Sequence, residues 1–202
     1  MKNLLFILSL FIQTVVFSQT ITQTEYEKLI TQTKEGVKID KNDKTVLNLL
    51  SDFYAEALQS DKGELNQDIP KRIEKLYADK NAKNLHILNM FFAYQDHISQ
   101  TAAVGKNPDA NFQVKLMADL EREIQSLYGV VPVIIKIYKA ESLSSSGQTK
   151  EAAEVVSTSL LEFPNSIPLK VYKYLGTKDE KIRKDLVENH PNHWMVQQFG
   201  IK

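Results

Sequence analysis

The fold class is decided by one stretch of the sequence, VVPVIIKIY at residues 130–138. Its β-branched residues are typical of a strand. Pro132, however, suits the first turn of a helix, and residues 139–143 continue the segment without a break. A lone strand could not satisfy its backbone hydrogen-bonding groups, and no second segment of comparable strand character exists to pair with it. The stretch therefore predicts a helix, with a strand as the alternative.

On both sides of this stretch, glycine and proline separate segments with helical periodicity. The seven Gly and six Pro fall almost entirely between these segments. The expected helices cover about residues 22–34, 44–60, 70–77, 82–99, 112–128, 132–143, 149–162, 164–175 and 177–189, with 194–199 as a final turn or short helix. The pattern predicts an all-α chain of about eight or nine helices in antiparallel pairs. We expect one domain over residues 19–202, with residues 101–110 as the place where it could divide.

Residues 140–164 resemble a tetratricopeptide repeat (TPR), a pair of antiparallel helices that stacks on its neighbours. Five residues stand at the spacings of that motif: Ala140, Leu143, Gly147, Ala152 and Pro164. The two alanines let the helix axes approach closely, and the proline ends the pair.

The resemblance covers one repeat, and Lys136 and Lys139 stand where the family has large hydrophobic residues. It implies TPR-like pairs over residues 131–202, stacked as an α-α superhelix, and binding of a protein or peptide partner. A generic helical bundle is the alternative.

The first residues read as a secretory signal peptide. Lys2 gives a basic start, residues 4–17 are largely apolar, and Ser18 is a small residue before the polar segment that begins at Gln19. We expect cleavage between Ser18 and Gln19, with an uncleaved anchor as the alternative. The apolar run is shorter than the roughly 20 residues of a membrane span, so we expect no span in the mature chain. The protein is then exported, to the periplasm or the medium.

Composition excludes several kinds of site and partner. The chain has no Cys, so it can form neither a disulfide nor a thiolate metal site. It carries 25 basic and 25 acidic residues, and the only arginines, Arg72, Arg122 and Arg183, are scattered. A neutral, arginine-poor chain is expected to bind nucleic acid and anionic membranes poorly.

The four histidines do not form a recognisable catalytic or metal site. His86 and His97 are about three turns apart on one expected helix, too far to share a metal, and adjacent Asp96 points about 100° away from His97. His190 and His193 flank a turn without an identifiable third ligand, and His190 suits the end of the preceding helix. We expect no metal and no cofactor.

Tyr172, Tyr174 and Trp194 are the candidates for partner binding, since aromatic side chains are enriched at interfaces. Packing of at least two of them into the core is the alternative. We therefore expect an exported, soluble, helical-repeat-like scaffold or adaptor that binds a protein or peptide. Two alternatives remain open: an exported hydrolase with an unrecognised site, and a helical protein that holds a small ligand.

Overall fold

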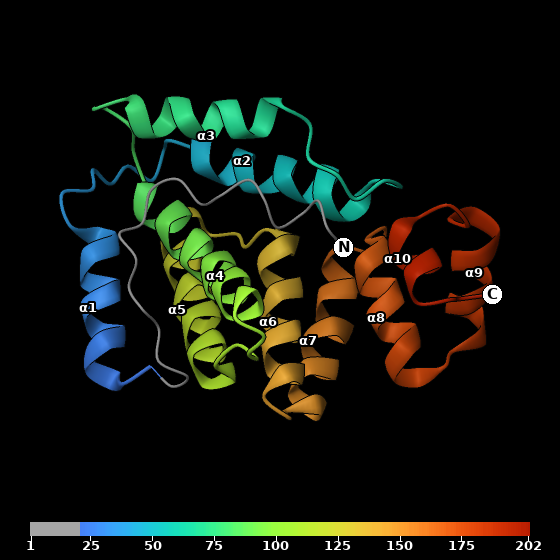
Figure 1. Cartoon of the computed structure of the whole chain (residues 1–202). Coiled ribbons are helices and arrows are strands. Elements are labelled where there is room, and N and C mark those ends of the chain that lie inside the picture. Colours follow the sequence, from blue (N-terminus) through green and yellow to red (C-terminus); the bar gives the residue numbers. More distant parts are fainter. Residues whose placement is uncertain (1–20) are drawn as a thin grey trace. The chain divides into compact units, whose positions relative to one another are not determined.

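The computed structural model describes residues 21–202, and these form helices joined by loops without a β-strand (Figure 1). A single isolated bridge between Lys38 and Lys83 is the one extended pairing in this part of the chain. The strand-like run is helical from Val133, which confirms the all-α fold class. None of the described helices is long and apolar enough to cross a membrane. The expected cleavage between Ser18 and Gln19 concerns residues outside the described part.

The chain divides into two compact units. Unit 1 comprises Met1–Asn48 and Pro70–Val131, and unit 2 comprises Leu49–Ile69 and Pro132–Lys202. Residues 101–110 lie inside unit 1, whereas almost the whole TPR-like region falls in unit 2.

Unit 1 is built around two long helices, and its elements are α1 (Gln23–Lys34), the start of α2 (Thr45–Tyr54), most of α3 (Asp68–Ala78), α4 (Leu85–Ala103) and α5 (Ala110–Tyr128). The capping box expected at the start of α1 is present, since Thr22 and Glu25 bond each other's backbone N–H groups. Helix α4 packs against both α1 and α5. Its two adjacent apolar stripes are buried, as expected of a central helix.

Helix α4 differs from the sequence-based boundaries at both ends. It starts at Leu85 because Asn84 has a left-handed backbone (φ +60°), and the buried Asn84 side chain bonds the main chain of Asp40 and Asp43. It continues to Ala103, so the following loop is shorter than predicted. Gly105, at φ +67°, then ends the helix, and the N–H of Lys106 reaches back to the carbonyl of Thr101 at 2.8 Å.

Unit 2 contains the π-helical turn η1 (Ala55–Gln59), α6 (Val133–Ser145), α7 (Thr149–Glu162), α8 (Ile167–Thr177), α9 (Glu180–Asn189) and the short α10 (Trp194–Gln198). Helix α6 packs against α7, α7 against α8, and α8 against α9 (Figure 1). Helices α8, α9 and α10 and the residues after α10 contribute an apolar cluster made of Ile167, Val171, Leu186, Met195, Val196 and Ile201.

The α6–α7 hairpin has the features that the motif predicts. Ala140 and Ala152 are both buried, which permits a close approach of the two helices. Gly147 has φ +82°, a left-handed conformation that favours glycine, in the turn between them. The structure is therefore compatible with a helical repeat, at the level of packed neighbouring helices.

Candidate functional site

The three aromatic residues singled out in the sequence all lie in unit 2. Tyr172, Tyr174 and Trp194 are partly buried and pack against the apolar cluster of this unit. Tyr172 and Tyr174 are two positions apart on α8, so their side chains leave the helix about 200° apart. The Tyr172 hydroxyl donates a hydrogen bond to Glu141 on α6, whereas the ring of Tyr174 lies 5.2 Å from the ammonium of Lys178. The two tyrosines therefore make their contacts on nearly opposite sides of α8.

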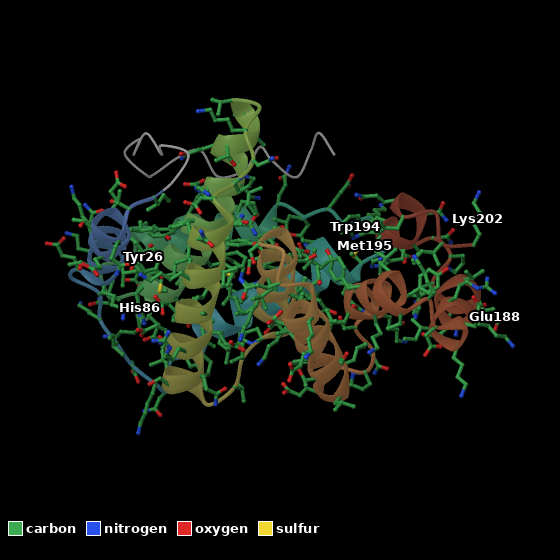
Figure 2. All side chains as sticks on the ribbon, turned by 90° about the horizontal axis from the view of Figure 1, so that it is seen from below. Tyr26, His86, Glu188, Trp194, Met195 and Lys202 are labelled. Carbon is green, nitrogen blue, oxygen red and sulfur yellow. The ribbon has the colours of Figure 1, made fainter. Side chains whose placement is uncertain are left out.

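Trp194 joins the start of α10 to the loop after η1. Its backbone N–H donates to the carbonyl of Asp61 at 3.0 Å, and its indole covers Gly63. A Cβ atom at Gly63 would lie 2.6 Å from the indole, so only glycine leaves room for this ring. The indole Nε1 is buried and has no hydrogen-bond partner within residues 21–202. Trp194 and its neighbour Met195 thus anchor the C-terminal part of unit 2 (Figure 2).

His193 is a fully buried neutral residue that also connects the start of α10 to η1. Its Nδ1 accepts the N–H of Met195 at 3.3 Å, and its Nε2 lies 2.9 Å from the carbonyl oxygen of Leu58. A carbonyl only accepts, so Nε2 carries the proton and both ring nitrogens are occupied. Burial lowers the pKa of His193, in keeping with a neutral ring. A metal could bind here only by breaking one of these contacts.

A second set of hydrogen bonds ties η1 to the start of α8. The Tyr54 hydroxyl lies 2.5 Å from the Gln59 side-chain oxygen and 2.8 Å from the Ser166 hydroxyl. Gln59 in turn accepts the N–H of Ile167 and donates to the carbonyl of Asn165. Segments that are distant in the sequence are therefore fixed together by side chains.

Glu141 of unit 2 is a candidate functional residue that the sequence analysis missed. The residue keeps some exposure, but burial of its carboxyl raises the pKa from 4.5 to about 7, while the hydrogen bond from Tyr172 acts in the opposite direction. The helical period shows how it could have been found. At 100° per residue, Glu141 shares a face of α6 with Ile134, Ile137 and Tyr138, all of which are buried. An acidic residue on an apolar face marks an unusual position.

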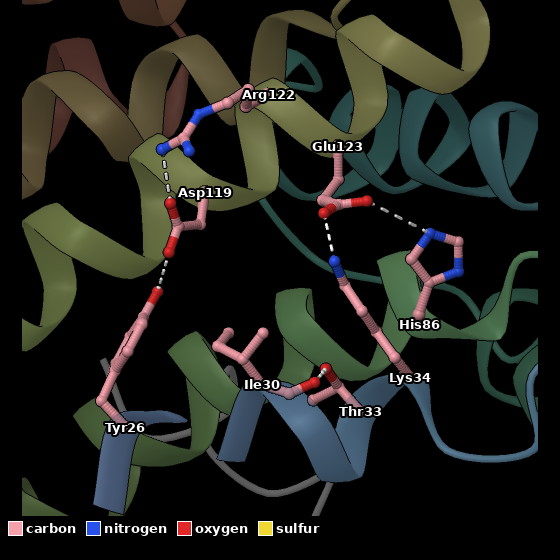
Figure 3. A network of polar contacts seen from close by, with 8 residues as sticks. All are labelled: Tyr26, Ile30, Thr33, Lys34, His86, Asp119, Arg122 and Glu123. Carbon is pink, nitrogen blue, oxygen red and sulfur yellow. Dashed lines mark hydrogen bonds and ion pairs between the residues drawn. The ribbon is translucent and has the colours of Figure 1, made fainter. Parts of the chain in front are cut away.

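Unit 1 contains a network of polar contacts that fixes α1 to α5 (Figure 3). The Tyr26 hydroxyl donates to Asp119 at 2.5 Å, and Asp119 also pairs with Arg122 at 2.5 Å. Burial, followed by the bond to Asp119, raises the pKa of Tyr26 far above its usual value. The hydroxyl therefore stays protonated and acts as a donor.

One turn further along α5, Glu123 bonds Lys34 of α1 and lies 3.9 Å from Nε2 of His86 on α4 (Figure 3). His86 is buried, and its Nδ1 has no partner among the described residues. Burial lowers its pKa more than the nearby carboxylate raises it, so the ring is neutral at pH 7. No hydroxyl group of residues 21–202 is bonded to this histidine, and the network is best understood as the attachment of α1.

His97 lies further along α4, and its role is also local. Its Nε2 accepts the backbone N–H of Asp109 at 2.8 Å, next to the start of α5. Asp109 caps α5 and accepts the N–H of Ile21 as well. His97 thus supports the loop between α4 and α5. Within residues 21–202, no group of three His, Asp or Glu side chains could hold a metal ion.

Comparison with known proteins gives no relative: no protein-family model matches the sequence, and no curated protein or solved structure is significantly similar to it. The structural observations therefore carry the functional interpretation alone. Among them, the contact between Glu141 and Tyr172 is the best candidate for a functional site.

Proposed function

We propose that the protein is exported and acts outside the cytoplasm as a helical-repeat-like scaffold or adaptor that binds a protein or peptide through unit 2. The observation that carries this proposal is the order of packing, in which α6 packs on α7, α7 on α8 and α8 on α9. Stacked helix pairs expose a continuous row of first helices, and such rows are used for extended binding surfaces. The partly buried aromatic residues of α8 lie on this part of the chain.

Export is proposed from the sequence of residues 1–19, which has the basic start, apolar run and small residue of a cleaved signal. The TPR-like identity of the α6–α7 hairpin is supported by its buried alanines and by the glycine in its turn. On this proposal, loss of the binding surface would impair assembly with the partner rather than a chemical reaction.

Photo-cross-linking tests this proposal at one defined surface. Ser145 is exposed and lies one turn after Glu141 on the same face of α6, so a photoreactive benzoylphenylalanine placed there would meet a bound partner. The same replacement at Glu154, exposed on α7, is the control. We expect irradiation in the native envelope to yield a discrete cross-linked partner from position 145 and not from position 154. Absence of cross-links from position 145, with the variant folded and exported, would contradict the proposal.

A further inference from the structure

Glu141 lies where two successive hairpins meet. It belongs to α6, the first helix of one pair, and its carboxyl accepts a hydrogen bond from Tyr172 on α8, the first helix of the next pair. The carboxyl is therefore placed on the row of first helices, the surface that the proposed function assigns to a partner.

No cation of the described chain pairs with this carboxyl. The side chains of Lys170 and Lys173 on α8 bond residues of α9 and α7 instead, at 2.6 and 2.7 Å. Lys136 and Lys139 are on α6 itself, but the helical period places them about 140–160° around the helix from Glu141. The ion pairs found within residues 21–202 do not include Glu141, and its one hydrogen-bond donor there is the Tyr172 hydroxyl.

A partly buried carboxylate without a cation is costly, because it has lost water and gained a single neutral hydrogen bond. The same desolvation that raises the pKa of Glu141 makes a close positive charge more favourable there than at an exposed carboxylate. Glu141 nevertheless keeps some exposure, and Ser145, one turn further along the same face, is exposed at the end of α6.

We propose that Glu141, oriented by Tyr172, binds the lysine or arginine side chain of a partner peptide that docks at the exposed C-terminal end of α6, beside α8. The proposal rests on the proposed function and specifies the chemistry of the partner. The cation would occupy the carboxylate oxygen that Tyr172 leaves free, and Tyr172 would act as a positioning residue.

An array of immobilised dodecapeptides of varied sequence tests the proposal. Each peptide is present in its parent form and in a copy with every Lys and Arg replaced by Gln. The exported chain is applied as wild type, as Glu141→Gln and as Glu154→Gln. The control removes an equal charge from an exposed glutamate of α7. Circular dichroism and the emission of Trp194 verify that both variants are folded.

We expect wild type and Glu154→Gln to select Lys- or Arg-containing parents over their Gln copies, and Glu141→Gln to lose at least about tenfold in affinity for those parents. Cation-dependent binding that is equal in Glu141→Gln would overturn the site. Equal binding of the parent peptides and their Gln copies would overturn the proposed partner chemistry. In either of these two outcomes, the proposed function of peptide binding would still hold. No binding to any peptide would also overturn this inference, and the cross-linking experiment would then decide the proposed function separately.

Discussion

The strongest quantitative prediction concerns the pH dependence of the stability of unit 2. Glu141→Gln keeps the shape of the side chain and its ability to accept the Tyr172 hydroxyl, but removes the ionisation. In the folded protein the pKa of Glu141 is raised from 4.5 to about 7, so folding favours the protonated carboxyl. The stability that this carboxyl contributes is fully present below pH 4.5 and is lost as the pH rises through 7.

The magnitude follows from the shift. A difference of about 2.5 pKa units corresponds to about 3 kcal/mol. Glutamine resembles the protonated form at every pH. We therefore expect Glu141→Gln to be more stable than wild type by about 3 kcal/mol at pH 8, and by less than 1 kcal/mol at pH 5.

Urea unfolding at the two pH values measures this difference. Trp194 is the only tryptophan, and it lies in the same unit as Glu141, so its emission reports the unfolding of unit 2. Other groups titrate in both proteins and cancel in the comparison. Equal effects of Glu141→Gln at pH 5 and pH 8 would refute the reasoning, because they would mean that the carboxyl is not desolvated between α6 and α8.

Three further predictions concern other parts of the chain. Gly63→Ala should destabilise unit 2 by about 2–4 kcal/mol in thermal unfolding, because it combines a left-handed backbone with a clash against Trp194. The control, Gly147→Ala, has open space at its Cβ and should cost about 1 kcal/mol. Equal losses of stability in the two variants would contradict the packing of Trp194 over Gly63. In an NMR titration His193 should protonate below pH 6.5. Its contribution to the stability of the fold is therefore present above pH 6.5 and is lost as the pH falls through its lowered pKa. A titration midpoint above 6.5 would contradict the buried neutral ring. The intact mass of the protein from its native host should correspond to a chain that begins at Gln19, and a mass that includes the first residues would exclude cleavage.

Much of the fold could be predicted from the sequence because helix boundaries are encoded locally. Apolar periodicity, Gly, Pro and caps such as Thr22 with Glu25 indicated where the helices lie, with differences of a few residues at their ends. The β-branched run at 130–138 is helical because tertiary burial outweighs intrinsic preference: from Val133 to Ile137 its apolar side chains are all buried. The left-handed conformation of Asn84, which depends on contacts with a distant loop, left no local signal.

The candidate site was less predictable, because it depends on pairs of residues that are far apart in the sequence. Trp194 looked like an exposed aromatic, but its indole packs over Gly63 from another segment. Tyr172 acquired its role only through Glu141, one hairpin earlier. A periodicity argument places each residue on a face of its own helix, but it does not say which helix covers that face.

The measurement that tests the central claim most directly is the backbone NMR assignment of residues 130–145. Helix α6 packs on α7, and Glu141 meets Tyr172, only if this segment is helical, so both the repeat-like packing and the proposed binding site depend on it. From Val133 to Ser145 we predict downfield ¹³Cα shifts and sequential amide–amide contacts, as in a helix. Upfield ¹³Cα shifts at 133–138, with cross-strand contacts to another extended segment, would contradict the helical array and the site built on it.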